Sequence, residues 1–306
     1  MTGPVRKILA AFGLVAMIVS FWFLYGQVER YGALLPDGTL LLGNIGTLAI
    51  LAFGYMGALC LLAEVWYLIL KGLSTERPAE RAHAYVSFLS SQIVKYLPTG
   101  IFHLVGRFGW LVARGYNKAA VGKATGVELG LMLLLASALS LVGVILEPPA
   151  AGVFSGMLAS IGIAPVPLWL MVTVAGTVAG IGWLVFQRYF LDGVKSISPF
   201  ALVAGLLFFG LQAAVFAGCY HLVAGALQFG ILPLFTLSWL LGFVAVSAPG
   251  GFGVREAAFI VLTTGLIEPD LALYSVVLFR LVTLGGELVA FGAGYAINVA
   301  QKNQLT

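Results

Sequence analysis

Residues 200–226 read FALVAGLLFFGLQAAVFAGCYHLVAGA, a run without a single Asp, Glu, Lys or Arg. A helix of roughly 20 apolar residues is long enough to cross the hydrocarbon core of a bilayer. Of the 306 residues in the chain, 61% are hydrophobic and only 9% are charged, whereas soluble domains carry about 25% charged residues. Water cannot solvate a surface of this composition. The sequence therefore predicts an all-α, polytopic membrane helical bundle without a soluble domain.

Five more apolar runs join residues 200–226 as predicted full spans. They are 8–25, 40–70, 124–146, 167–186 and 271–300. The first of them follows Arg6 and Lys7, as a secretory signal would. It is longer than an ordinary signal region, however, and lacks a small-residue cleavage site, so we interpret it as a retained span.

The apolar stretch 83–106 is broken by Pro98-Thr-Gly100 and lies between two basic segments, 71–81 and 107–123. Lys and Arg favour cytoplasmic loops, so both ends of this stretch are expected at the cytoplasmic face. It is too short for two crossings, which would need about 40 residues. We predict a re-entrant helical hairpin with the break at its tip, where freed backbone groups are buried in protein or line a cavity.

A second apolar stretch, 232–267, is broken by Pro249-Gly-Gly-Phe-Gly253. The loops on either side carry no basic residue, so this stretch is expected to enter and leave from outside. It is predicted as a second re-entrant hairpin, although its length would also allow two short, tilted crossings.

The order of elements repeats along the chain. Residues 1–147 and 148–306 each give span, span, hairpin and span, and the two series start on opposite faces. Such inverted repeats build many secondary transporters. We predict a single integral membrane domain over residues 1–306. It is expected to be multi-pass in the cytoplasmic (inner) membrane, with both termini cytoplasmic.

The strongest local constellation runs from Ser247 to Glu256, where a helix is expected to restart near Gly253. Its first turn would present free N–H groups and the positive end of the helix dipole. Arg255 lies in that turn and could grip a phosphate or carboxylate with two hydrogen bonds. Close packing of helices is the structural alternative for the glycines. The simplest role for Glu256 is structural, as a helix cap or as a partner for a basic residue.

Ionisable side chains at membrane depth are costly and are functional candidates by default. Each of them could equally pair internally and hold the bundle together. Arg280 and Glu287 share a helix face that must turn inward, and Arg280 could meet Glu256 or a substrate phosphate. The predicted substrate-binding residues are Lys95, Arg107, Glu128, Pro249, Gly250, Gly251, Gly253, Arg255, Glu256, Arg280 and Glu287.

Metal, cofactor and catalytic sites are not expected. Cys60 and Cys219 stand singly in apolar runs, as buried small hydrophobes do, and the three histidines share no metal-ligand spacing. The loops are short for a nucleotide-sugar site, no Walker-type phosphate loop is present, and no Gly-flanked serine has a histidine partner. The sequence thus predicts no metal, no cofactor and no enzymatic activity.

Three segments resemble a known family: Lys95-Tyr-Leu-Pro-Thr-Gly100, Pro249-Gly-Gly-Phe-Gly-Val-Arg-Glu256 and Leu278-Phe-Arg-Leu281. With the order of elements, they are similar to the flippase-like family that includes the transmembrane region of lysylphosphatidylglycerol synthases and related stand-alone membrane proteins. The resemblance covers about residues 10–300. It implies translocation of a lipid, often in a glycolipid or envelope-polymer pathway. Lysyl transfer is not expected, because the soluble transferase domain of the synthases is absent.

The leading hypothesis is a lipid flippase or lipid transporter that moves an anionic lipid or lipid-linked sugar across the cytoplasmic membrane. Its partners would be membrane lipids and this cargo, and not nucleic acid. The alternative is a non-catalytic membrane partner subunit of a glycosyltransferase or an envelope-lipid pathway. A small-solute or ion transporter is the third reading.

Overall fold

The computed structural model describes residues 38–96, 102–146, 198–245 and 253–303, together with Gly152 and Gly251. The regular elements of this part of the chain are helices. Two predicted spans, 8–25 and 167–186, lie outside the described residues, as do the candidate site residues Pro249 and Gly250 and the break at 98–100.

Four helices in the described part are long and apolar enough to cross a membrane. They are α3 (Ile45–Leu73), α6 (Lys118–Leu146), α9 (Pro199–Ala224) and α12 (Pro269–Asn303). A short helix, α2 (Gly38–Gly43), precedes α3. The prediction of a helical membrane protein is confirmed, and four of the predicted spans match these helices to within a few residues.

Local sequence signals explain where α9 begins and ends. Ser198 caps its start, since the Ser198 hydroxyl accepts a hydrogen bond from the backbone N–H of Phe200 at 3.2 Å, and Pro199 suits the first helical position. Gly225 ends the helix with φ +71°, and its N–H donates to the carbonyl of His221 at 2.8 Å. Glycine adopts this left-handed conformation without steric cost.

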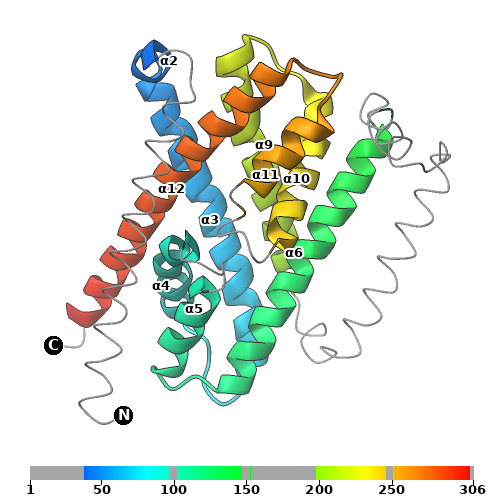
Figure 1. Ribbon diagram of the computed structural model, residues 1–306. Coiled ribbons are helices and arrows are strands. Elements are labelled where there is room, and N and C mark those ends of the chain that lie inside the picture. Colours follow the sequence, from blue (N-terminus) through cyan, green and yellow to red (C-terminus); the bar gives the residue numbers. More distant parts are fainter. Residues whose placement is uncertain are drawn as a thin grey trace.

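Two pairs of shorter helices occupy opposite ends of the bundle (Figure 1). The first pair is α4 (Arg81–Ser91), continued by the 3-10 helix η1 (Gln92–Tyr96), and α5 (Phe102–Val112). The second pair is α10 (Leu232–Val244), preceded by the 3-10 helix η2 (Phe229–Ile231), and α11 (Val254–Leu262). The first pair lies in the lower half of Figure 1 and the second in the upper half.

The expected boundary of the first broken stretch at Gly106 was wrong. Helix α5 continues to Val112, and Arg107, which the sequence assigned to a basic loop, is 2% exposed within it. Arg107 is held inside the protein because it pairs with Glu128 of α6. The loop begins only after α5, at Ala113.

Helix α3 lies at the centre of the bundle, against α4, α6, α9 and α12. The backbones of α3 and α12 approach closely at Gly286, where an added β-carbon would lie 2.6 Å from the carbonyl oxygen of Ala52. Small residues permit such contacts between membrane helices, where van der Waals packing drives association.

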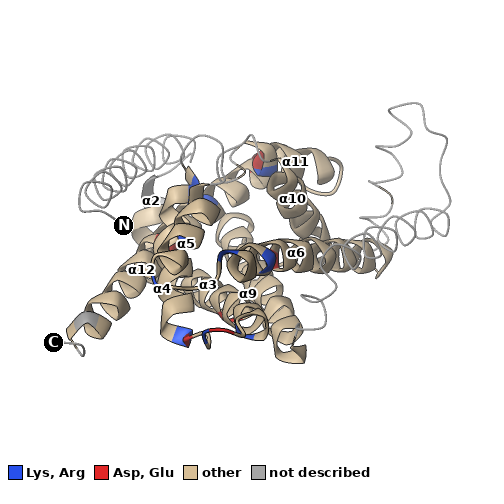
Figure 2. Cartoon of the chain, turned by 90° about the horizontal axis from the view of Figure 1, so that it is seen from below, with Lys and Arg blue, Asp and Glu red and all other residues tan. Residues whose placement is uncertain are grey.

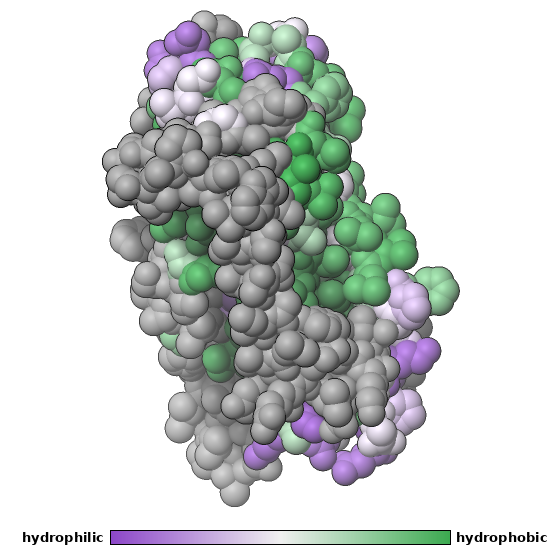
Figure 3. Space-filling model, turned by 90° about the vertical axis from the view of Figure 1, so that its right-hand side faces the viewer, coloured by the Kyte–Doolittle hydropathy of each residue, from purple (hydrophilic) through white to green (hydrophobic). Residues whose placement is uncertain are grey.

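The described residues form an apolar surface in the middle of the face that Figure 3 shows. Figure 3 shows hydrophobic residues across the middle of one face and hydrophilic residues toward both ends. Helix α9 contributes exposed Leu202, Val203, Leu206 and Leu207. In a bilayer these side chains face lipid instead of water, so their exposure fits a membrane-embedded protein.

A polar network connects the α3–α4 and α5–α6 loops at the lower end of Figure 1, and Figure 2 shows charged residues gathered at this end. The Tyr116 hydroxyl accepts a hydrogen bond from the backbone N–H of Glu80 at 3.1 Å and lies 3.1 Å from His83 Nδ1. Arg77 donates to Glu80 at 3.1 Å. Burial in this network raises the pKa of the Tyr116 hydroxyl, which therefore stays protonated at neutral pH.

Candidate functional site

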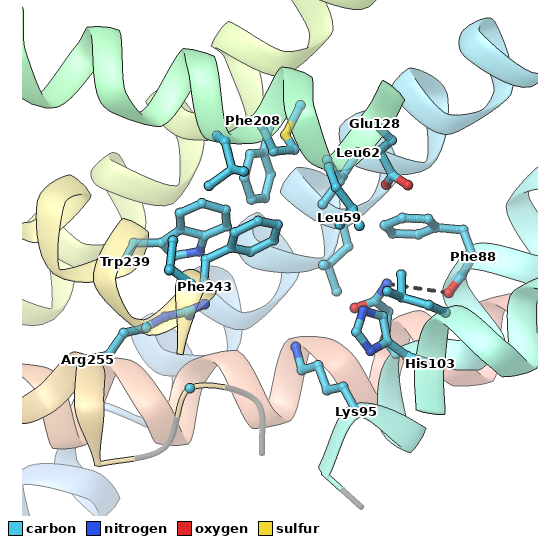
Figure 4. A pocket seen from close by; sticks show the side chains of 18 of the residues that line it. Leu59, Leu62, Phe88, Lys95, His103, Glu128, Phe208, Trp239, Phe243 and Arg255 are labelled. Carbon is cyan, nitrogen blue, oxygen red and sulfur yellow. Dashed lines mark hydrogen bonds between the residues drawn. The ribbon is translucent and has the colours of Figure 1, made fainter. Parts of the chain in front are cut away.

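A cavity of about 420 Å³ lies between the α4–α5 pair and the α10–α11 pair. Helices α3, α6 and α9 complete its wall (Figure 4). Most of the wall is apolar or aromatic. The polar residues that line it are Tyr55, Gln92, Lys95, His103, Arg107, Glu128 and Arg255.

The structure brings five of the predicted site residues to this one cavity. They are Lys95, Arg107, Glu128, Gly251 and Arg255. Glu256, Arg280 and Glu287 are buried and pair with one another or with Lys95. Gly253 is exposed at the start of α11. Residues from the two broken stretches, far apart in sequence, therefore share one cavity.

Arg107 and Glu128 form a two-pronged ion pair between α5 and α6. Arg107 Nη1 donates to Glu128 Oε1 at 3.1 Å, and Nη2 donates to Oε2 at 2.5 Å. The guanidinium carbon also lies 3.9 Å from the centroid of the Trp66 ring. Parallel hydrogen bonds of this kind are among the strongest in proteins, so both charges are satisfied at the cavity wall.

Lys95 ties the first broken stretch to the last helix. Its Nζ donates to Glu287 Oε1 at 2.5 Å. The Tyr96 hydroxyl donates to Oε2 of the same carboxylate, and the Tyr55 hydroxyl lies 3.5 Å from Oε1. Glu287 is 1% exposed, so a buried carboxylate is surrounded by donors, as burial requires.

Arg280 pairs with Glu256 and so joins α12 to α11. Of the two partners that the sequence allowed for Arg280, the structure provides the carboxylate. Glu256 Oε2 also accepts from the backbone N–H of Gly253 at 2.7 Å, which caps the helix start as the sequence indicated. Gly253 has φ +81° and Gly251 φ +71°, a conformation that favours glycine.

Arg255 is different from the other three basic residues. Within the described residues it has no ion-pair partner. Its buried Nε, like that of Arg107, has no hydrogen-bond partner there. Its guanidinium carbon lies 5.2 Å from the centroid of the Trp239 ring. Figure 4 shows Arg255 and Trp239 together on one side of the cavity and Lys95 and His103 on the other.

Two glycines make room for the Arg255 side chain. A β-carbon added to Gly242 of α10 would lie 2.5 Å from Arg255 Cγ, and one added to Gly251 would lie 3.3 Å from Arg255 Nε. The glycines at this point of the chain thus serve a specific contact. They allow the Arg255 side chain to lie between Gly242 of α10 and Gly251.

Sequence reasoning missed the aromatic part of the wall. Trp239 stacks on Phe243 with 4.9 Å between ring centroids, and Phe208 meets Trp239 edge-on at 6.2 Å. All three line the cavity. Within long apolar runs, an aromatic residue that faces a cavity has the same local sequence signal as one that faces lipid, so no pattern distinguished them.

No protein-family model matches the chain, and a search of curated proteins found no match. Among the described residues, no group of three His, Cys, Asp or Glu side chains could hold a metal ion. The function must therefore be argued from the cavity and its charges.

Proposed function

We propose that this chain is a lipid flippase or lipid transporter that moves an anionic lipid or lipid-linked sugar across the cytoplasmic membrane, without catalysing a covalent step. The cavity charge carries the proposal: Arg255 lines a cavity inside a membrane-embedded bundle and forms no ion pair with the described residues. A charge in such a place is costly and is retained for function. An anionic head group would supply the missing counter-charge and hydrogen-bond acceptors.

The arrangement of the two broken stretches supports transport. The α4–α5 pair lies toward one end of the bundle and the α10–α11 pair toward the other, with the cavity between them (Figure 1). In our proposal, six full spans and these two hairpins form an inverted repeat, both termini are cytoplasmic, and the hairpins open the cavity to each face in turn. The resemblance to the transmembrane region of lysylphosphatidylglycerol synthases favours the same reading.

A partner subunit of a glycosyltransferase would have no need for this cavity. Such a subunit would hold its enzyme through a surface, and neutral residues at the positions of Arg255 and Lys95 would pack with less cost. An unbalanced cation in an apolar cavity is therefore better explained by cargo than by anchoring.

Lipid movement in reconstituted vesicles tests the proposal. We would compare wild type, Arg255→Gln and Lys118→Gln, using fluorescent phosphatidylglycerol and a quencher that cannot cross the bilayer. Lys118 is exposed at the start of α6. The Lys118→Gln variant therefore removes one positive charge outside the cavity and serves as the control. We expect inner-leaflet lipid to become accessible with wild type and Lys118→Gln, and to stay protected with Arg255→Gln.

The proposal would be wrong if wild-type vesicles behaved like protein-free vesicles toward both an anionic phospholipid and a polyprenyl-phosphate sugar. It would also be wrong if Arg255→Gln moved lipid as fast as wild type. Mass spectrometry of co-purified lipids should agree, with one anionic or sugar-bearing lipid enriched in wild type and lost in Arg255→Gln.

A further inference from the structure

We propose that the cavity selects head groups with a single net negative charge, that is, phosphodiesters without an ammonium group, and discriminates against diphosphate and zwitterionic head groups. This inference rests on the proposed function for the source of its ligand, a membrane lipid. It goes further in naming the charge of the group that the cavity accepts.

The basis is the charge balance on and behind the cavity wall. Three basic side chains form ion pairs with carboxylates there, and one basic side chain has no ion-pair partner among the described residues. The three pairs are Arg107–Glu128, Arg280–Glu256 and Lys95–Glu287. Counted over their Lys, Arg and Glu side chains, the described groups of the site carry one net positive charge, on Arg255. The segments 97–101 and 246–250 and Phe252, which adjoin these residues in the sequence, contain no ionisable side chain.

Both oxygens of each of the three carboxylates already accept a hydrogen bond, which holds these groups in place. Both oxygens of Glu128 accept from Arg107. Glu256 accepts from Arg280 with one oxygen and from the Gly253 N–H with the other. Glu287 accepts from Lys95 with one oxygen and from Tyr96 with the other. Among the described residues of the site, Arg255 is therefore the cation that a ligand can neutralise without breaking an ion pair.

A second negative charge would have no counter-charge in this cavity. Burying an unpaired charge in apolar surroundings is very costly, and recruiting Lys95 or Arg107 would leave a carboxylate buried alone. A zwitterionic head group brings an ammonium that would compete with Arg255 for the same phosphate and add a cation. One phosphodiester leaves the site neutral.

The size of the cavity agrees with a head group alone. A water molecule occupies about 30 Å³ in the liquid, so the cavity of about 420 Å³ holds a phosphate with a small polyol or one sugar. Acyl or prenyl chains have to stay outside, in the bilayer. Phe208, Trp239 and Phe243 give the cavity an apolar, aromatic wall on the side of Arg255. Apolar surroundings strengthen the attraction between a cation and an anion.

The test measures binding of short-chain lipids with identical tails to the full-length protein in detergent. The probes are phosphatidylglycerol, diacylglycerol pyrophosphate and phosphatidylethanolamine. We expect phosphatidylglycerol to bind at least about tenfold tighter than either of the others, the size of a charge-assisted hydrogen bond. Arg255→Gln should remove this preference, and Arg255→Lys, which keeps the charge, should retain it.

A change of charge on the wall should change the preference. Glu128→Gln leaves Arg107 unpaired and adds one positive charge to the cavity, so it should improve binding of the diphosphate probe relative to phosphatidylglycerol. The double variant Arg107→Gln/Glu128→Gln restores the net charge and should restore the wild-type order. Circular dichroism and gel filtration identify any variant that fails to fold.

The inference is overturned if wild type binds the diphosphate probe or phosphatidylethanolamine as tightly as phosphatidylglycerol, or if Arg255→Gln binds phosphatidylglycerol unchanged. Its failure is separable from that of the proposed function. If the protein transported a diphosphate lipid, the proposed charge selection would be wrong, but the proposed function as a lipid transporter would stand. Arg255-dependent binding of phosphatidylglycerol, with no lipid crossing vesicles, would refute transport while the site stands.

Discussion

The Arg255 side chain packs against Gly242 in the place that a larger side chain at Gly242 would occupy. A β-carbon on Gly242 would lie 2.5 Å from Arg255 Cγ. Helix α10 therefore sets the position of the cation that the cavity presents. A residue on one arm of the second broken stretch has to lack a side chain so that the other arm can place its arginine beside Trp239.

Gly242→Ala should displace Arg255 and lower lipid transport about tenfold, since a misplaced charge loses its hydrogen bonds to the cargo. The matched control is Gly210→Ala in α9, where an added β-carbon would have nothing within 4 Å. The vesicle assay measures both. Equal rates for the two variants would show that the position of Arg255 does not matter for transport.

The Lys95–Glu287 pair should show strong coupling. Lys95→Met alone leaves the carboxylate buried without its cation, and losing one partner of a buried pair costs about 3–5 kcal/mol. The double variant Lys95→Met/Glu287→Gln should be more stable than Lys95→Met, because no lone charge remains. Unfolding in mixed micelles measures the free energies.

A surface pair provides the control for this cycle. Arg81 bonds to Glu64 at 2.8 Å, but the Arg81 side chain is 64% exposed, and exposed pairs contribute about 0–1 kcal/mol. Arg81→Gln should therefore change stability little. If Lys95→Met were equally mild, the carboxylate of Glu287 would not depend on its cation.

Arg107→Lys should destabilise the protein although it keeps the charge. Lysine cannot make both hydrogen bonds to Glu128 or lie flat on Trp66, and one lost bond to a charged group costs about 1.5–3 kcal/mol. Lys118→Arg at the exposed start of α6 should have no measurable effect. Wild-type stability in Arg107→Lys would mean that charge alone holds α5 against α6.

Gly286→Ala should push α12 away from α3, because the added carbon meets the Ala52 carbonyl oxygen at 2.6 Å. Overpacking of this kind costs about 1–3 kcal/mol. Gly292→Ala in the same helix meets nothing within 4 Å and should be neutral or slightly stabilising, since alanine favours helices by about 0.5–1 kcal/mol over glycine. Thermal unfolding should rank Gly286→Ala below Gly292→Ala.

The long helices could be predicted from sequence because lipid demands uninterrupted apolar length. The run 200–226 became α9, with its ends set by Ser198 and Gly225. The extent of α5 could not be predicted, since Arg107 looked like a loop residue. Its burial depends on a partner 21 positions later, and no local pattern reports such a contact.

The candidate residues could be found because ionisable groups are rare and costly in a membrane segment. Their pairing could not be found. Lys95 and Glu287 are 192 positions apart, and Arg280 had two plausible partners until the fold placed Glu256 beside it. Only the ion pairs among the described residues reveal that Arg255 lines the cavity without a paired carboxylate there.

The unbalanced charge on Arg255 also bears on the membrane potential. If the chain moves lipid as proposed, Arg255 stays with the protein, so a head group that crosses from this cavity would carry its own negative charge through the field. An inside-negative potential favours outward movement of each such charge by about 2.3 kcal/mol per 100 mV. A carrier of this kind would export its cargo more readily from an energised membrane than from a depolarised one, without a nucleotide or a coupling ion.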